Sequence, residues 1–175
     1  MKILFVCLGN ICRSPLAVGV LQKQVDKLNL TWQIASAGLA NKYVGCTADP
    51  RVLTVAKRHS VDLSQHIARK FQVSDFDQYD RIITMDDELA NRLRAKAVNL
   101  TQADKVGLLP DFLIGLGDNV DMPDPYFWDI ELFESLFIKI KTACQLLVET
   151  YNTPDILDLF EDTMTTNALG LAQRA

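Results

Sequence analysis

A loop of eight residues near the N-terminus, Cys7 to Ser14, constrains this chain more than any other feature. It follows the apolar run Lys2–Val6, which is typical of a short buried strand. The Ser14-Pro15 pair is typical of a helix start, with Ser at the N-cap and Pro at the first helical position. The sequence therefore predicts a loop between a strand end and a helix N-terminus, where backbone N–H groups and the helix dipole favour an anion.

A cysteine at the first position of this loop and an arginine at the seventh indicate a phosphate site. Gly9 permits close backbone approach, and Asn10 tolerates a left-handed conformation. Cys7 would be the thiolate nucleophile, which a helix N-terminus and a nearby arginine favour. The planar guanidinium of Arg13 can bind two phosphate oxygens, and Ser14 is placed to donate its hydroxyl to the Cys7 sulfur. The predicted phosphate-binding loop comprises Leu8, Gly9, Asn10, Ile11, Cys12 and Ser14.

These residues resemble the signature of the low-molecular-weight protein tyrosine phosphatases. The resemblance covers about residues 1–150 and continues, in the family's order, through Ser36-Ala37-Gly38, Asp49-Pro50-Arg51, His66-Ile67-Ala68-Arg69, Thr84-Met85-Asp86 and Asp124-Pro125-Tyr126. It implies hydrolysis of phosphotyrosine and small aryl phosphates through a cysteinyl-phosphate intermediate. It also implies an α/β fold, with a four-stranded parallel sheet of order 2-1-3-4 and helices on both faces.

A general acid is expected in the long segment 110–127. The leaving oxygen needs a proton as the P–O bond breaks, so a carboxylic acid must lie opposite the thiolate. Spacing alone does not choose among the four aspartates of this segment, which are Asp111, Asp118, Asp121 and Asp124. Pro125 rigidifies the backbone beside Asp124, and Tyr126-Phe127 offers an aromatic wall. The resemblance maps the family's Asp-Pro-Tyr acid onto Asp124.

The resemblance also implies a supporting shell and a substrate slot. Asn10, Ser36 and His66 match family residues that hydrogen-bond one another and hold the loop in its strained conformation. Lys42 stands where the family usually has Trp or Tyr on one wall of the slot. A backbone shift would let Tyr43 take that place. The predicted slot walls are Lys42, Tyr43, Tyr126 and Phe127.

Strands and helices alternate along the chain, which is typical of a parallel sheet covered by helices on both faces. The predicted strands are Lys2–Val6, Thr31–Ala37, Arg81–Met85 and Lys105–Leu109. Three helices are expected to begin at Pro15, at Pro50 and after Asp86. A further helix is expected after Phe127, reaching about Tyr151. One face of the first helix would carry Ala17, Leu21, Val25 and Leu28. In such folds ligands bind beyond the carboxyl ends of the strands, where the loop after the first strand lies.

A second unit is expected after the phosphatase domain of residues 1–152. Thr153-Pro154 is typical of a fresh helix start, so the extension 153–175 is predicted to be helical and then frayed. Apolar residues recur there at helical spacing: Ile156, Leu157, Phe160 and Met164. Acidic residues occupy the other side: Asp155, Asp158, Glu161 and Asp162. Packing on its own domain and binding of a partner both remain open.

Composition limits the partners. The net charge of -4 and the pI of about 5.1 argue against nucleic acid and anionic membranes. No apolar run approaches the roughly 20 residues of a membrane span. The four cysteines lack the spacing of a zinc site and fit a reducing, cytoplasmic setting. We expect no metal or cofactor, a monomer or weak homodimer, and phosphate- or sulfate-like anions in the loop.

Three other functions stay open. A protein arginine phosphatase uses the same scaffold, but that branch carries Thr where this chain has Ile11, whose bulk favours an aryl group. A thiol-coupled arsenate reductase needs further cysteines near the first, and none lies between Cys46 and Cys144. A non-catalytic phosphopeptide-binding module would not need the three catalytic side chains, which are Cys7, Arg13 and Asp124.

A redox role is predicted for Cys12. A low-pKa thiolate at Cys7 would be oxidised readily by peroxide. Cys12 lies in the same curled loop, so it is placed to form a disulfide with Cys7 and make the inactivation reversible.

Overall fold

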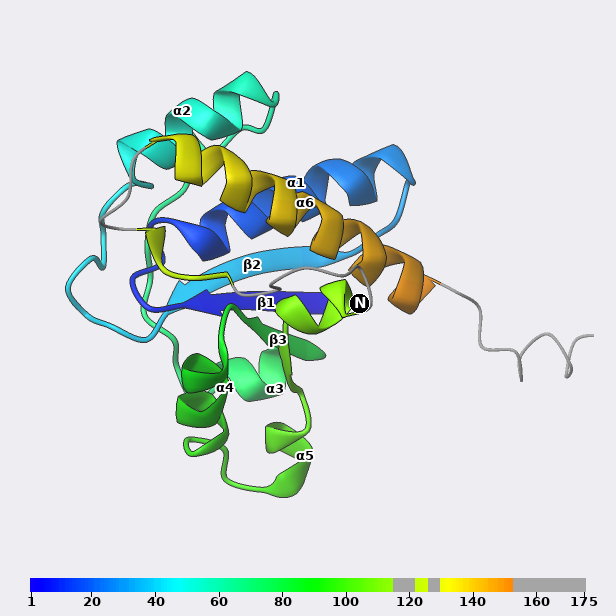
Figure 1. Ribbon diagram of the computed structural model, residues 1–175. Coiled ribbons are helices and arrows are strands. Elements are labelled where there is room, and N and C mark those ends of the chain that lie inside the picture. Colours follow the sequence, from blue (N-terminus) through cyan, green and yellow to red (C-terminus); the bar gives the residue numbers. More distant parts are fainter. Residues whose placement is uncertain (115–121, 126–129, 153–175) are drawn as a thin grey trace, which may run out of the picture.

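The computed structural model describes residues 1–114, 122–125 and 130–152 (Figure 1). The predictions for Asp118, Asp121, Tyr126, Phe127 and the extension 153–175 therefore lie outside the described residues. The described strands form a four-stranded parallel sheet of order β2-β1-β3-β4. This confirms the predicted fold class and strand order.

The described helices and strands follow the predicted alternation. The strands are β1 (Lys2–Cys7), β2 (Gln33–Gly38), β3 (Arg81–Thr84) and β4 (Val106–Leu108), each within two residues of its predicted ends. The helices are α1 (Arg13–Lys27), α2 (Pro50–Arg58), α3 (Asp75–Gln78), α4 (Asp87–Arg94), α5 (Leu100–Ala103) and α6 (Ile130–Asn152), with a 3-10 turn η1 (Pro110–Leu113). The short helices α3 and α5 were not predicted, because one helical turn leaves little periodicity to detect.

The central strand β1 is buried on both faces, as its unbroken apolar run requires. Successive side chains of a strand point to opposite faces of the sheet. Ile3 and Phe5 accordingly join a core formed with α1, α2 and α6, while Leu4 and Val6 join a second core with α3 and α4. Figure 1 shows these two groups of helices on opposite sides of the sheet.

The strand order places the functional loop at the topological switch point. β1 pairs with β2 on one side and with β3 on the other, so the connections from β1 diverge at its carboxyl end. Cys7 is the last residue of β1, opposite Gly38 of β2. The loop therefore opens where ligands bind in such sheets.

The prediction for the buried face of α1 is correct for three residues and wrong for Leu28. Ala17, Leu21 and Val25 are fully buried. Leu28 is 50% exposed, because α1 ends at Lys27 and the chain turns away there.

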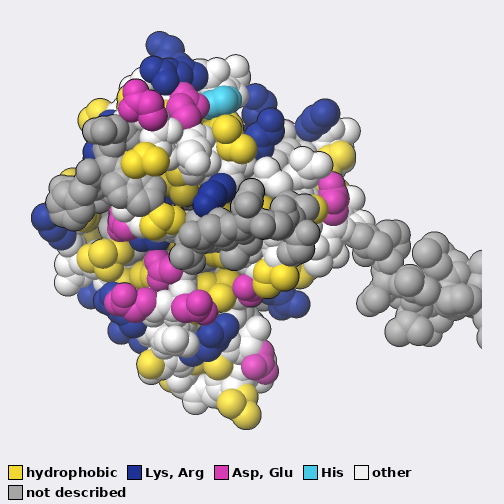
Figure 2. Space-filling view, in the orientation of Figure 1, with side chains coloured by type: hydrophobic (Ala, Val, Ile, Leu, Met, Phe, Trp, Pro, Cys, Tyr) yellow, Lys and Arg dark blue, Asp and Glu magenta, His cyan; other side chains and the backbone are white. Residues whose placement is uncertain are grey.

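On the face shown in Figure 2, acidic and basic side chains are interspersed. Among the described helices, none combines the length and apolarity needed to cross a membrane.

Candidate active site

The Cys7 sulfur lies between the carboxyl end of β1 and the N-terminus of α1. Its Sγ atom is 3.0 Å from Oγ of Ser14 and accepts a hydrogen bond from the backbone N–H of Asn10 at 3.2 Å. The N-terminus of α1, which is the positive end of the helix dipole, lies beside the same sulfur. The surroundings of this sulfur therefore match those of a cysteine nucleophile.

Ser14 does not have its predicted place at the helix N-cap. The helix begins at Arg13, and Cys12 occupies the N-cap without a side-chain hydrogen bond. Ser14 is thus inside the first turn, and its hydroxyl contacts the Cys7 sulfur instead of a backbone N–H. The predicted contact between Ser14 and Cys7 is present, but the Ser-Pro signal misplaced the helix start.

Asn10 organises the loop from a fully buried position. Its φ is 57°, the left-handed conformation that the sequence predicted it would tolerate. Its side-chain Nδ2 donates to Oγ of Ser14 at 2.9 Å and to Oγ of Ser36 at 2.8 Å. Its Oδ1 accepts from the backbone N–H of Arg69 at 3.0 Å, and its carbonyl accepts from Nε2 of His66 at 2.7 Å. The structure thus brings the predicted shell residues together around Asn10.

Two glycines let the loop pack closely. A Cβ atom on Gly38 would lie 3.0 Å from the carbonyl carbon of Gly9 and the nitrogen of Asn10, so β2 supports the loop from beneath. A Cβ atom on Gly9 would lie 2.8 Å from the ring of Tyr43. The Tyr43 ring therefore lies directly against the loop, on the wall where the sequence predicted it.

The Arg13 guanidinium is buried and held from two directions. Its Nη1 donates to Oδ2 of Asp86 at 2.8 Å and to the carbonyl of Met122 at 3.0 Å. Its Nη2 donates to Oδ2 of Asp124 at 3.0 Å. The roles of Asp86 and Met122 were missed. Asp86 follows β3 at the same sheet edge as Cys7, which is a signal that could have indicated it.

A cleft of about 470 Å³ contains the predicted chemistry. Its lining comprises Cys7, Leu8, Gly9, Ile11, Cys12, Arg13, Ala40, Lys42, Tyr43 and Asp124. The predicted nucleophile, the arginine and the predicted acid thus share one cleft, and Ala40 is the lining residue that the sequence did not indicate. The ammonium group of Lys42 lies 5.0 Å from the ring centroid of Tyr43, within cation–π range. Leu8 is partly exposed at the rim.

Cys12 differs from Cys7 in its surroundings. Burial, reinforced by the negative charge of Asp49, raises the pKa of the Cys12 thiol well above its usual range. Asp49 caps α2 and binds Arg51, whose guanidinium lowers the pKa of that carboxyl. Both Cys7 and Cys12 are free thiols in the structure.

Comparison with known sequences decides the family. The profile described as "Low molecular weight phosphotyrosine protein phosphatase" matches residues 2–154. The chain belongs to the low molecular weight phosphotyrosine protein phosphatase family. This confirms the resemblance that the sequence indicated. The protein is a phosphatase of this family, and its enzyme class is that of the hydrolases. The enzyme of Saccharomyces cerevisiae is 35% identical over 144 residues, covering 80% of this chain and 88% of its own. The human enzyme is 33% identical over 151 residues, which cover 85% of this chain and 94% of the human one.

Solved structures of phosphatases are also similar to this protein. An Entamoeba histolytica tyrosine phosphatase with Hepes in the active site has a TM-score of 0.82 at 31% identity, covering 87% of this chain and 97% of its own. Wzb of Vibrio vulnificus, in complex with benzylphosphonate, has a TM-score of 0.73 at 33% identity, covering 85% and 97%. The Drosophila arginine phosphatase has a TM-score of 0.82 at 31% identity, covering 89% and 100%. Phosphate-like ligands therefore bind phosphatases of this fold.

The described part of this phosphatase holds no cluster of three or more His, Cys, Asp or Glu side chains that would bind a metal ion. Arg13, Lys42 and the N-terminus of α1 bring positive charge to the cleft.

Proposed function

We propose that this phosphatase hydrolyses phosphotyrosine, in proteins and as small aryl phosphates, through a cysteinyl-phosphate intermediate. The observation that carries the proposal is the Cys7 sulfur at the N-terminus of α1, in one cleft with Arg13 and Asp124. Cys7 is the nucleophile, Arg13 and the loop amides bind phosphate, and Asp124 is the general acid and base. The free cysteines fit a cytoplasmic setting for this activity.

In the first step the Cys7 thiolate attacks phosphorus while the bond from phosphorus to the phenolic oxygen breaks. Asp86 and Met122 both bind Nη1 of Arg13, so they fix the guanidinium without using its Nε–Nη2 edge. That edge can bind two phosphate oxygens. Nη2 would exchange Asp124 for a phosphate oxygen, and the released carboxylate would take up a proton from solvent. Asp124 would then give this proton to the leaving phenolic oxygen.

In the second step the Asp124 carboxylate takes a proton from a water molecule, which attacks the phosphocysteine. The bond from sulfur to phosphorus breaks, inorganic phosphate leaves, and the Cys7 thiolate is restored. The contacts from Ser14 and from the N–H of Asn10 stabilise this leaving thiolate.

Replacement of the nucleophile tests the mechanism. Cys7→Ser should abolish hydrolysis of p-nitrophenyl phosphate, because a serine hydroxyl is not ionised at neutral pH. Calorimetric titration with inorganic phosphate should still show binding, since the loop and Arg13 remain. Cys46→Ser is the matched control, because Cys46 is exposed and lies outside the cleft. Turnover by Cys7→Ser above about a tenth of wild type would exclude the cysteinyl-phosphate.

The similarity to an arginine phosphatase supports a second candidate substrate, phosphoarginine. Ile11 is buried at 8% exposure and lines the cleft, where its apolar side chain suits an aryl ring better than a guanidinium. The wild type should therefore prefer phosphotyrosine, and Ile11→Thr should raise the ratio of phosphoarginine to phosphotyrosine hydrolysis. Faster phosphoarginine hydrolysis by the wild type would reverse the order of the two candidates.

The two remaining functions have less support. Cys144, the third buried cysteine, lies on α6 with its thiol directed to the carbonyl of Ala17 and not to the cleft, so it does not suit an arsenate reductase. The complete set of catalytic groups in one cleft argues against a binding-only module.

A further inference from the structure

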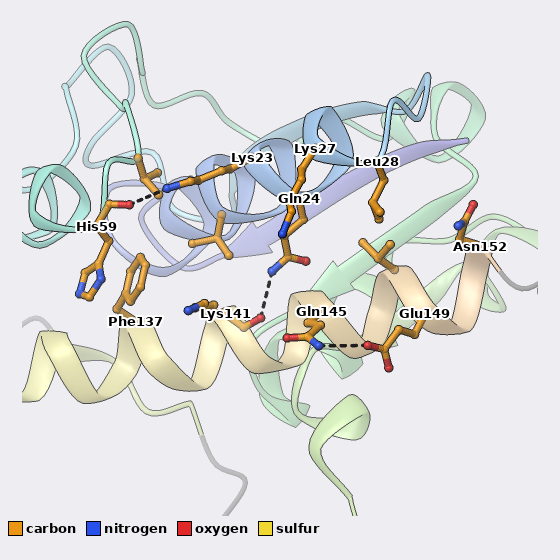
Figure 3. A pocket seen from close by; sticks show the side chains of 13 residues that line it. Lys23, Gln24, Lys27, Leu28, His59, Phe137, Lys141, Gln145, Glu149 and Asn152 are labelled. Atoms are coloured by element: carbon orange, nitrogen blue, oxygen red, sulfur yellow. Dashed lines mark hydrogen bonds between the residues drawn. The ribbon is translucent and has the colours of Figure 1, made fainter.

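A second cavity, of about 740 Å³, lies between α1 and α6 and is larger than the active-site cleft (Figure 3). Its lining comes from the second half of α1, the turn after α2 and most of α6: Val20, Lys23, Gln24, Lys27, Leu28, His59, Val61, Phe137, Lys141, Gln145, Val148, Glu149 and Asn152. We call it the α1–α6 groove. The catalytic residues lie at the opposite, N-terminal end of α1, so the groove serves no step of the proposed mechanism.

The groove combines an apolar floor with a cationic rim. Phe137 and Val148 form part of the floor, and Leu28 exposes half of its surface there. Lys27 and Lys141 form no ion pair with any residue that the structure describes. Lys23 donates only to the carbonyl of His59 within that part of the chain. Glu149 also lines the groove, near the end of α6, so three lysines stand against one carboxylate among its described lining residues. An occupant of the groove would therefore need apolar side chains flanked mainly by carboxylates.

The wall of the groove also contains a buried acceptor that lacks a hydrogen bond. Nε2 of Gln24 donates to the carbonyl of Lys141 at 3.2 Å. Oε1 of Gln24 is buried and has no donor among the described residues. A buried acceptor without a partner costs stability, and a donor on an occupant would remove that cost after a small rotation of the amide.

The chain itself carries a segment with the required chemistry. Residues 153–175 begin where α6 ends, at Asn152, which lines the groove. Their apolar positions are Ile156, Leu157, Phe160 and Met164, and their acidic positions are Asp155, Asp158, Glu161 and Asp162. The family profile ends at residue 154, so the family does not account for this segment.

We propose that residues 153–175 fold back and occupy the α1–α6 groove, with their apolar positions on its floor and their acidic positions beside Lys23, Lys27 and Lys141. Pro154 cannot continue α6, which favours a reversal of the chain at this point. From Phe137 to Asn152 the groove wall on α6 is about 22 Å long, at 1.5 Å per residue. A helix over residues 154–164 would cover about 15 Å of it.

Amide hydrogen exchange of the full chain, measured by mass spectrometry, tests this docking. In the wild type the amides of residues 155–164 should exchange about tenfold or more slowly than in a triple charge reversal of the groove. That variant is Lys23→Glu with Lys27→Glu and Lys141→Glu. Its matched control reverses three exposed lysines elsewhere, Lys57→Glu, Lys70→Glu and Lys96→Glu, and should keep the slow exchange.

A reciprocal variant separates docking from general charge effects. Reversal of the four acids of the segment to lysine should release it, and combination with the groove reversal should restore slow exchange, because the charges are then exchanged between the two sides. Hydrolysis of p-nitrophenyl phosphate should stay at wild-type rates throughout, so the outcome does not depend on the proposed mechanism. Fast exchange in the wild type, or protection that survives the groove reversal, would overturn the proposal. Protection that grows with protein concentration would assign the groove to a second copy and overturn it equally.

Discussion

Asn10 shows how a single side chain can stabilise a loop shaped for an anion. A left-handed conformation costs a non-glycine residue about 1–2 kcal/mol. Asn10 makes four hydrogen bonds through its side chain and its carbonyl, each worth about 0.5–1.5 kcal/mol net, so together they exceed the strain. The same conformation directs the Asn10 N–H at the Cys7 sulfur. The hydrogen bonds that hold the backbone therefore also maintain the surroundings of Cys7, the proposed nucleophile.

The proposed role of Asp124 as general acid predicts that the effect of its loss depends on the leaving group. Asp124→Asn keeps an acceptor for Nη2 of Arg13 but loses the proton that a phenolate needs. A general acid contributes about 10²–10⁴-fold, so phenyl phosphate hydrolysis should fall by this factor. Hydrolysis of p-nitrophenyl phosphate should fall much less, because its leaving group is already stable as an anion. Steady-state rates on both substrates provide the measurement.

Asp111→Asn is the control for that comparison. Asp111 belongs to the same segment, and burial raises the pKa of its carboxyl, but it does not line the cleft. Both substrates should react at wild-type rates in this variant. Equal losses for the two substrates in Asp124→Asn would mean that another group supplies the proton.

The position of Lys42 leads us to expect a preference for phosphopeptides with acidic residues. Its ammonium group is exposed at the mouth of the cleft, above the Tyr43 ring. An exposed ion pair is worth about 0.2–1 kcal/mol, so acidic residues beside the phosphotyrosine should improve kcat/KM only a few-fold, and salt should weaken this effect. A phosphopeptide panel assayed with Lys42→Ala should show the preference lost, while Lys57→Ala should retain it. An unchanged preference in Lys42→Ala would exclude a role for this lysine.

Parallel strands bring the parts of the site to one edge of the sheet. The loop after β1 and the start of α4 after β3 both lie at the carboxyl ends of their strands. Asp86 therefore has two roles, because it caps α4 through Leu89 and holds Arg13 through an ion pair. Arg13 is almost fully buried, so its orientation depends on these partners.

Two substitutions of Asp86 separate these roles. Asp86→Asn can still accept from the Leu89 N–H but loses the ion pair, so kcat/KM should fall about 10- to 100-fold with little change in stability. Asp86→Ala also loses the cap, which should lower the free energy of unfolding by about 0.5–2 kcal/mol. Urea denaturation and aryl phosphate kinetics measure the two effects.

Asn99→Ala removes the cap of α5, away from the site, and serves as the control. It should lower stability without changing kcat/KM. Full activity in Asp86→Asn would show that Met122 and the loop suffice to hold Arg13.

The site couples parts of the chain that are far apart in sequence, so it exists only when the fold is complete. Arg13 and Asp124 are 111 positions apart, and His66 reaches the loop from a distance of 56 positions. The two cores on either side of the sheet hold these pieces in place. Global unfolding should consequently abolish the geometry of the site.

His66 predicts a pH dependence of stability. Burial lowers the pKa of His66 below its ordinary value of 6.5, against a smaller opposite effect of its hydrogen bond to Asn10. Well above pH 6.5 the ring is neutral in both states and contributes no pH dependence. Below it the unfolded chain binds the proton first, so the free energy of unfolding should fall as the pH decreases from 6.5 towards the folded pKa.

His66→Gln should reduce this slope, because glutamine can donate to the Asn10 carbonyl and does not titrate. Urea denaturation of both proteins between about pH 5.5 and 7.5 provides the measurement, since carboxyl groups titrate mainly at lower pH. The difference between the two slopes belongs to His66, because His59 is present in both proteins. Identical slopes in the two proteins would exclude His66 as the responsible group.

The sequence by itself determined the features that depend on neighbouring residues. The apolar run before Cys7 indicated β1, and the spacing from Cys7 to Arg13 indicated a phosphate loop. Such patterns are informative because strand periodicity, helix capping and turn preferences act over a few residues. The resemblance then selected Asp124 among four aspartates that spacing could not distinguish.

Only the tertiary structure decided which distant groups meet. It paired Arg13 with Asp86 and the Met122 carbonyl, and it placed Gly38 beneath the loop. It also left Leu28 half exposed beside a cationic groove, although periodicity assigned it to the buried face of α1. These outcomes depend on strand order and on how helices from different parts of the chain pack, and no short stretch of sequence contains that information.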